Sequence, residues 1–211
     1  MSSYIYNLIR QGENETLDFK HSITNSVKIA RSLVAFANTH GGKLLIGVKD
    51  NGTISGIQTE EEYYMVESAA HLHCKPEIRF LTETWNIKGK TILEITIPKS
   101  LDKTYSAKDH LGKWKVYIRV QDQNLLANKI LLKVWKQKKR KSGTYIHYTP
   151  KEKLLLSYLS DNEFITFSKF RKIAKISPYK AERILVNMIV VNLIDIVFTE
   201  EQTYYRLKRS D

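Results

Sequence analysis

The front half of the chain alternates between helical and strand-like patterns of apolar residues. Between Ser26 and Asn38 the apolar positions recur at helical spacing, and Gly41-Gly42 is expected to end that helix. The apolar run 43–48 predicts a buried strand, and Asp50-Asn51-Gly52 predicts a tight turn into a second strand through Ile54 and Ile57. The same reading predicts a helix over 59–72, strands over 77–84, 91–97 and 113–120, and a last helix over 124–135. Together these elements indicate an α+β fold: a mixed, mostly antiparallel sheet with flanking helices.

The last third of the chain has a different pattern, with three capped helices followed by a hairpin. Thr149-Pro150-Lys151-Glu152 is a capping box, and further helices start at Thr166 and at Ser177-Pro178. Short strands over 196–198 and 204–207 flank the acidic turn Glu200-Glu201. This order resembles the small winged helix-turn-helix family, whose third helix enters the major groove while the hairpin forms the wing. The resemblance implies groove contacts by Tyr179, Lys180 and Arg183, with Asn187 one turn later, although a DNA-contacting wing is usually basic.

These patterns predict three parts: an α/β domain over 1–141 that ends in a basic helix, a linker over 142–148, and a winged helix over 149–211. No stretch is long and apolar enough to suggest a membrane span, and the first residues lack the features of a signal peptide. Cys74 is the single cysteine, which excludes an internal disulfide. We therefore expect a cytoplasmic protein that does not interact with membranes.

Positive charge is concentrated beyond residue 100. Residues 1–100 carry 11 Lys and Arg against 11 Asp and Glu, whereas residues 101–150 carry 12 against 3. Such a local excess favours a polyanionic partner, because neutralised phosphates release their counterions; a solvated lysine-rich linker is the alternative. We expect nucleic acid, DNA more than RNA, to contact Lys113, Lys115, Arg119, Lys133, Lys136, Lys138, Lys139, Arg140, Lys141, Tyr179, Lys180 and Arg183.

Three short blocks in the first 120 residues share their order and spacing with a known family. They are Gly12 to Lys20, Ala35 to Gly52 and Val116 to Val120. Over about 1–135 the chain resembles the AlbA-like, or Schlafen-type, DNA-binding domain; one departure is Gln121, where a glycine is usual. Bacterial members often join this domain to a winged helix-turn-helix and are described as transcriptional regulators. The resemblance implies a DNA-binding regulator without enzymatic activity and without a cofactor.

The same resemblance implies an enzyme as the alternative. Some Schlafen proteins are endoribonucleases in which three carboxylates bind a divalent metal, and the matching positions here are Glu13, Asp18 and Asp50. Hard oxygen ligands of this kind would hold Mg²⁺ or Mn²⁺ against the scissile phosphate. Lys20, on the same strand face as Asp18, could stabilise the developing charge. A third interpretation is a protein-interaction module, with the winged helix forming a homodimer.

Overall fold

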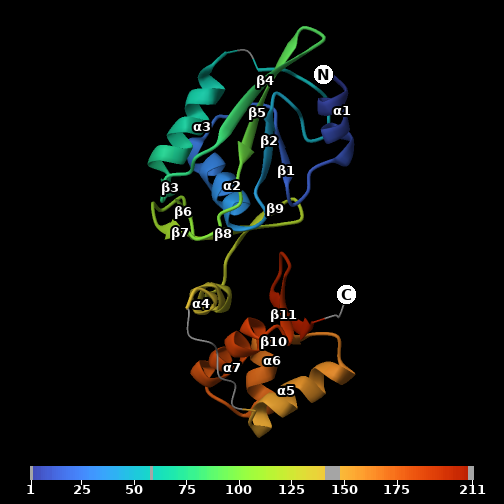
Figure 1. Ribbon diagram of the computed structural model, residues 1–211, viewed down its shortest axis with the longest axis vertical. Helices are drawn as coiled ribbons and strands as arrows, with labels where there is room; N and C mark the ends of the chain where they lie inside the picture. Colours follow the sequence, from blue (N-terminus) through green and yellow to red (C-terminus); the bar gives the residue numbers. More distant parts are fainter. Residues whose placement is uncertain (1, 58, 141–147, 209–211) are drawn as a thin grey trace. The chain divides into compact units, whose positions relative to one another are not determined.

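The computed structural model describes residues 2–57, 59–140 and 148–208, and it divides into two compact units, Met1–Ala127 and Asn128–Asp211 (Figure 1). The boundary differs from the predicted one, since the basic helix assigned to the first domain belongs to the second unit. Two of its apolar residues, Ile130 and Val134, pack into the core of that unit. Lys141 and positions 142–147 of the predicted linker lie outside the described residues.

Unit 1 is built around one four-stranded sheet. Its elements are α1 (Ser2–Gln11), β1 (Leu17–Lys20), α2 (Ser26–Asn38), β2 (Gly42–Ile46), α3 (Glu61–Leu72), β3 (Cys74–Lys75), β4 (Leu81–Ile87), β5 (Lys90–Ile97), β6 (Ser106–Lys108), β7 (Trp114–Lys115), β8 (Tyr117–Val120) and β9 (Gln123–Leu126). The main sheet has the order β1-β2-β5-β4, and only the β1–β2 pair is parallel. Two smaller antiparallel sheets, β3-β6-β7 and β8-β9, complete the unit. The predicted α+β class is therefore confirmed.

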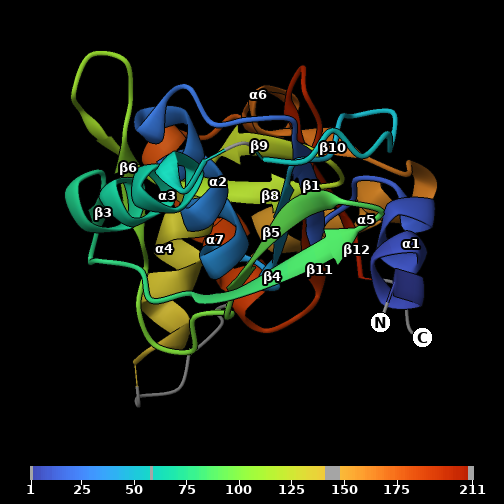
Figure 2. The same ribbon diagram turned by 90° about the horizontal axis from the view of Figure 1, so that it is seen from above.

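Helices cover both faces of the main sheet because its central strands are apolar on both sides. On one face, Leu44 and Ile95 pack against α2 and α3, which bury Leu33 and Val66 there. On the other face, Leu45 of β2 joins a cluster that includes residues of α1. Figures 1 and 2 show α1 and α2 on opposite sides of the sheet. Alternate residues of a strand point to opposite faces, so a continuous apolar run is what such a sheet requires.

The predicted Gly-Gly stop is present at the end of α2. Gly41 has a φ of +74° and donates its N–H to the Phe36 carbonyl at 2.8 Å. At Gly42 a Cβ would lie 2.4 Å from the Phe36 ring, so a side chain there would displace the aromatic core. The chain can therefore turn sharply from α2 into β2 only with glycine at these positions.

Some predicted elements of unit 1 differ in the structure. The expected strand 113–120 is interrupted at Val116, whose carbonyl instead accepts a hydrogen bond from the Ala127 N–H at 2.9 Å. The predicted helix 124–135 begins only at Lys129, because residues 123–126 form β9 and pair with β8. The segment 54–57 contributes isolated bridges at Ile54 and Ile57 in place of a full strand.

Unit 2 has a helical core covered on one side by a small sheet. Its elements are α4 (Lys129–Lys138), α5 (Pro150–Asp161), β10 (Ile165–Thr166), α6 (Phe167–Ala174), α7 (Pro178–Val190), β11 (Ile194–Phe198) and β12 (Thr203–Leu207). The strand order is β10-β12-β11, all antiparallel. The capping box of α5 is formed as predicted by Thr149 and Glu152. No helix in the described parts of the two units combines the length and the apolar character needed to cross a membrane.

Candidate nucleic-acid interface

The predicted acidic residues of the first block lie in a compact ionic cluster at β1. Asp18 is buried with 3% of its surface exposed, and its Oδ1 accepts hydrogen bonds from Lys20 Nζ at 3.1 Å and Arg119 Nη2 at 3.3 Å. Glu13 Oε1 accepts the Phe19 N–H at 2.8 Å, and Lys20 Nζ lies 3.8 Å from the same oxygen. Two carboxylates and two cations therefore share one small volume.

Glu13 and Asp18 lie close together, and their pKa values shift in opposite directions. Burial, followed by the hydrogen bond and charge of Asp18, raises the pKa of Glu13 to about 7. Burial would also raise the pKa of Asp18, but the hydrogen bond from Glu13 and the positive charges of Lys20 and Arg119 outweigh it and lower that pKa. Below neutral pH, Glu13 is thus the neutral donor and Asp18 the charged acceptor.

The expected three-carboxylate metal site is not formed. Asp50 lies exposed in the turn after β2, and the described residues contain no group of three or more His, Cys, Asp or Glu side chains that could hold a metal ion. Lys20 and Arg119 already neutralise Asp18, while burial and the neighbouring Asp18 raise the pKa of Glu13 and so favour its neutral form. Mg²⁺ and Mn²⁺ need ionised, accessible oxygens, so these residues do not fit such an ion.

Arg119 is not a nucleic-acid contact, contrary to the prediction. Only 2% of its surface is exposed, and its guanidinium donates to Asp18 and to the carbonyls of Asn14 and Leu17. The break at Val116 shifts the phase of the strand, so that Arg119 points inward and Trp114 outward. One sequence signal could have revealed this ion pair: the first family block has an acidic residue, Asp18, within an apolar strand, and the last block has a basic residue, Arg119, within another.

The Asn38-Thr39 pair at the end of α2 also proves structural. The Asn38 side chain donates to the carbonyls of Tyr105 and Tyr117, both at 2.9 Å, and accepts the Tyr105 N–H. The Thr39 hydroxyl accepts the Arg119 N–H at 2.9 Å. These bonds tie the second and third family blocks together and leave no polar group of the pair for a ligand.

We expect Glu13→Gln to stabilise the protein at pH 8 and to have little effect near pH 4.5. The folded-state pKa of Glu13 lies above its ordinary value of 4.5, so its ionisation destabilises the fold as pH rises from there through 7. The glutamine side chain keeps an acceptor for the Phe19 N–H and carries no charge, which predicts a gain of about 1 kcal/mol at pH 8. Urea denaturation at both pH values measures it, with Glu15→Gln at an exposed position as the control. Equal effects at both pH values would contradict the assignment.

Positive charge lies mainly in unit 2. Positions 1–127 carry 16 Lys and Arg against 14 Asp and Glu, whereas positions 128–211 carry 18 against 8. The net charges are therefore +2 and +10. The predicted contacts Lys113 and Lys115 are exposed on the β6–β7 hairpin of unit 1, whereas Lys133, Lys136, Lys138, Lys139 and Arg140 lie on or directly after α4 in unit 2.

Within unit 2, α4 packs against α7, and each of the two helices presents a row of mainly polar residues beside the apolar contact. Ile130 and Val134 are buried between α4 and the core, with Asn128 capping the helix through the Leu131 N–H at 2.9 Å. Beside this apolar stripe α4 and the turn after it present Lys133, Lys136, Gln137 and Arg140, while α7 presents Tyr179, Glu182, Arg183 and Val186. Both sets follow the spacing i, i+3, i+4, i+7, which places each on one side of its helix.

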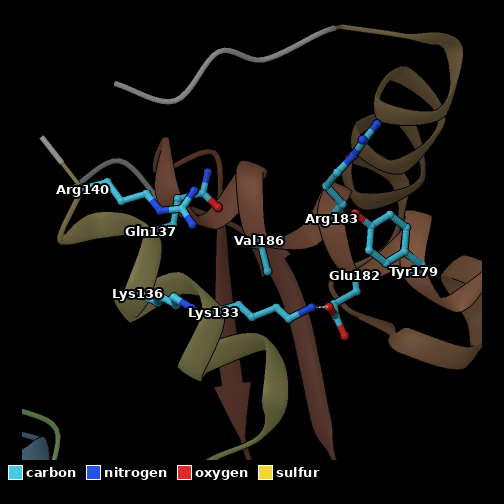
Figure 3. A pocket seen from close by; sticks show the side chains of 8 residues that line it. All are labelled: Lys133, Lys136, Gln137, Arg140, Tyr179, Glu182, Arg183 and Val186. Carbon is cyan, nitrogen blue, oxygen red and sulfur yellow. Dashed lines mark hydrogen bonds and ion pairs between the residues drawn. The ribbon is translucent and has the colours of Figure 1, made fainter. Parts of the chain in front are cut away.

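These eight residues line a cavity of about 300 Å³, called here the α4–α7 cavity. Figure 3 shows Lys136, Gln137 and Arg140 on one side and Tyr179 and Arg183 on the other, with Lys133 reaching across to Glu182. The Glu182 carboxylate also lies 3.6 Å from Lys129 Nζ. A hydrogen bond of 3.0 Å from Gln137 to Asn187 adds a second link between the helices.

The α4–α7 cavity contains more cations than anions, even after Lys133 has paired with Glu182. Glu182 is its sole carboxylate among the described lining residues, and it is neutralised by Lys133. Lys136, Arg140 and Arg183 are exposed and form no ion pair with any described residue. Lys138, Lys139 and Lys180 are exposed on the same two segments. Sequence reasoning found these cations, but it missed Gln137 and Glu182, which hold the two helices together.

The hairpin of unit 2 presents acidic residues at its tip, as the sequence indicated. Glu200 and Glu201 are exposed in the turn between β11 and β12. The Thr199 hydroxyl donates to the Gln202 carbonyl at 2.9 Å and closes the turn. Carboxylates at this tip repel phosphate, so the hairpin tip does not extend the basic surface of the unit.

Comparison with known proteins identifies the family of unit 1. No match was found among curated proteins. Among solved structures, the chain is similar to the DIP2311 protein of Corynebacterium diphtheriae (17% identity, TM-score 0.44), covering 70% of this chain but 34% of that one. It is also similar to the N-terminal domain of a RecG-related protein of Nitrosomonas europaea (16% identity, TM-score 0.43), covering 69% and 97% of the two chains. The sequence model of the Schlafen AlbA_2 family matches residues 13–128, which is more than half of the chain. The chain therefore belongs to the Schlafen AlbA_2 family.

Proposed function

We propose that this protein binds nucleic acid, DNA in preference to RNA, and that unit 2 holds backbone phosphates in the α4–α7 cavity. The observation that carries the proposal is the convergence of Lys136 of α4, Arg140 of the turn after it and Arg183 of α7 on one cavity of about 300 Å³. Arginine and lysine head groups in this arrangement suit phosphate oxygens, and the hydroxyl of Tyr179 offers a further donor. The family of unit 1 supports the same class of partner.

We further infer that residues 149–208 are a winged-helix module, with α7 as the recognition helix and β11–β12 as the wing. The support is the order helix, short strand, helix, helix, hairpin, in which β10 joins the hairpin in one sheet. Winged helices are typical of DNA-binding regulators. Regulation of transcription is therefore the role that we propose for the whole chain.

In this proposal α7 does not read the major groove alone. Gln137 of α4 engages Asn187, and Lys133 engages Glu182, so α4 lies over part of the helix face that would otherwise meet base edges. Phosphate contacts from the two helices fix position on a duplex without carrying sequence information. Base contacts are then left to Lys180, at the exposed start of α7 and outside the cavity lining.

Salt-dependent binding tests the proposal. The full chain is titrated against a fluorescein-labelled 20-base-pair DNA duplex by fluorescence anisotropy, at several salt concentrations between about 50 and 200 mM. If several phosphates are contacted, affinity should fall by at least about tenfold across this range. Affinity that stays constant with salt, or no binding at 50 mM, would contradict it. A parallel titration with duplex RNA of the same sequence should give weaker binding.

A further inference from the structure

A second basic surface lies on the β3-β6-β7 sheet of unit 1, and it has an aromatic side chain at its centre. The register pairs Lys108 with Trp114 and Lys75 with Ser106. Cross-strand partners share a face, and neighbours along a strand alternate. Ala107, between Ser106 and Lys108, is buried in the core. Lys75, Ser106, Lys108 and Trp114 therefore occupy the outer side, called here the Trp114 face.

Two lysine head groups lie over the Trp114 ring, and much of the side chain is nevertheless exposed. Lys108 Nζ lies 5.3 Å from the ring centroid and Lys75 Nζ lies 6.0 Å from it, both within the range of a cation–π contact. Nevertheless, 42% of the tryptophan surface is exposed. A large apolar ring in this position has no role in the core, so its packing does not explain it.

The charges around the ring favour an anionic partner. Lys113, directly before Trp114, is exposed at the end of the hairpin turn. The nearby carboxylate of Asp109 accepts the backbone N–H groups of Leu111 at 2.8 Å and Lys113 at 2.9 Å. Its Oδ1 is thereby used to shape the turn, and the three lysines near the ring outnumber this one carboxylate.

We propose that the Trp114 face binds single-stranded nucleic acid, with an unpaired base stacked on the Trp114 ring and the adjacent phosphates contacted by Lys75, Lys108 and Lys113. A flat aromatic ring among lysines on a sheet surface is the combination that single strands use, because every unpaired base offers a π-face. A duplex cannot use it, since its bases are stacked on one another. This site lies in unit 1 and goes beyond the phosphate cavity of unit 2; it rests on the proposed function only in that the ligand is nucleic acid.

Affinity measurements with the full chain test the site. Trp114→Ala should weaken binding of a labelled 12-nucleotide oligo-dT about tenfold, as expected for one lost stacking contact, while Trp114→Phe should retain most of the affinity. Affinity for a 20-base-pair duplex should change less than twofold in both variants. The matched control is Tyr64→Ala, which removes an exposed aromatic ring from α3, beside Glu61 and Glu62. This control should bind like the wild type.

A spectroscopic readout covers the case in which Trp114→Ala is poorly folded. Oligo-dT should quench the tryptophan fluorescence of the wild type, and Trp114→Phe should lose a large share of that quenching although Trp85 and Trp135 remain. Unchanged oligo-dT affinity in Trp114→Ala, or an equal loss for duplex and single strand, would overturn the inference. The same variant is also tested for binding to phosphatidylserine vesicles. If Trp114→Ala loses binding to these vesicles but keeps its oligo-dT affinity, the face binds a lipid surface, and this result too would overturn the inference. Wild-type protein that binds no nucleic acid would refute the proposed function itself.

Discussion

Replacing Arg119 with methionine is expected to lower the free energy of unfolding of unit 1 by about 3–5 kcal/mol. The change keeps much of the side-chain volume but removes the more deeply buried of the two cations that pair with Asp18, together with the donors to the Asn14 and Leu17 carbonyls. The half-exposed Lys20 then remains as the cation next to a buried carboxylate, and two backbone carbonyls lose their donor, which costs more than removing both partners of the ion pair. Urea denaturation followed by circular dichroism measures the loss, and amide hydrogen exchange in β1 and α2 assigns it to unit 1.

The double variant Asp18→Asn, Arg119→Met separates charge from packing. Neutralising Asp18 should recover part of the loss, because the buried charge that Arg119 balanced together with Lys20 is gone, so the two single effects should not be additive. Lys113→Ala, at an exposed position of the same unit, should change stability by less than about 0.5 kcal/mol. If Arg119→Met costs less than about 1 kcal/mol, the buried cluster does not stabilise the unit as described.

Reversing three charges in the α4–α7 cavity should reduce affinity for duplex DNA on the order of 100-fold at about 100 mM salt. The variant Lys136→Glu, Arg140→Glu, Arg183→Glu replaces the cations that the structure leaves without an ion pair in the described residues. Carboxylates in their place would repel the phosphates that the cavity is proposed to hold. Fluorescence anisotropy with the labelled duplex measures the change.

The control for that experiment is a second triple variant, which has the same net charge but has its three substitutions outside the α4–α7 cavity. Lys28, Lys49 and Lys153 are exposed and do not line the cavity, so reversing them tests the effect of overall charge. This control should lose less than about tenfold in affinity. Equal losses in the two triple variants would show that binding depends on net charge and not on the cavity.

Much of the fold could be predicted because local signals and tertiary structure agree there. The helix over Ser26 to Asn38 has the predicted bounds, since an apolar stripe, the Asn25 cap and the Gly41-Gly42 stop all act within one short segment. In unit 2 the Thr149 capping box and the Ser177 cap fixed the starts of two helices.

The candidate site was harder to predict because it depends on pairings between distant residues. Alternation along 113–120 indicated an outward Arg119, but the break at Val116 reverses the phase and buries it against Asp18, 101 positions away. No local pattern reports such a break. The placement of α4 in unit 2 likewise depends on Ile130 and Val134 meeting α7, a contact that helical periodicity alone does not assign.

The charge pattern along the sequence identified residues that lie together in the structure, but it also grouped residues that belong to different units. It identified Lys136, Arg140, Tyr179 and Arg183, which do come together around one cavity. It also grouped them with Lys113 and Lys115, which belong to the other unit. The homodimer and the protein-interaction role stay predictions.

The number of phosphates bound by the cavity can be counted from the salt dependence of affinity. For duplex DNA, the slope of log affinity against log salt changes by roughly 0.9 for each phosphate contact removed. The variant Lys136→Ala, Arg140→Ala, Arg183→Ala should therefore show a slope shallower than that of the wild type by roughly 2.7. A slope that matches the wild type, whatever the absolute affinity, would mean that these three side chains do not contact phosphates, and would contradict the central claim.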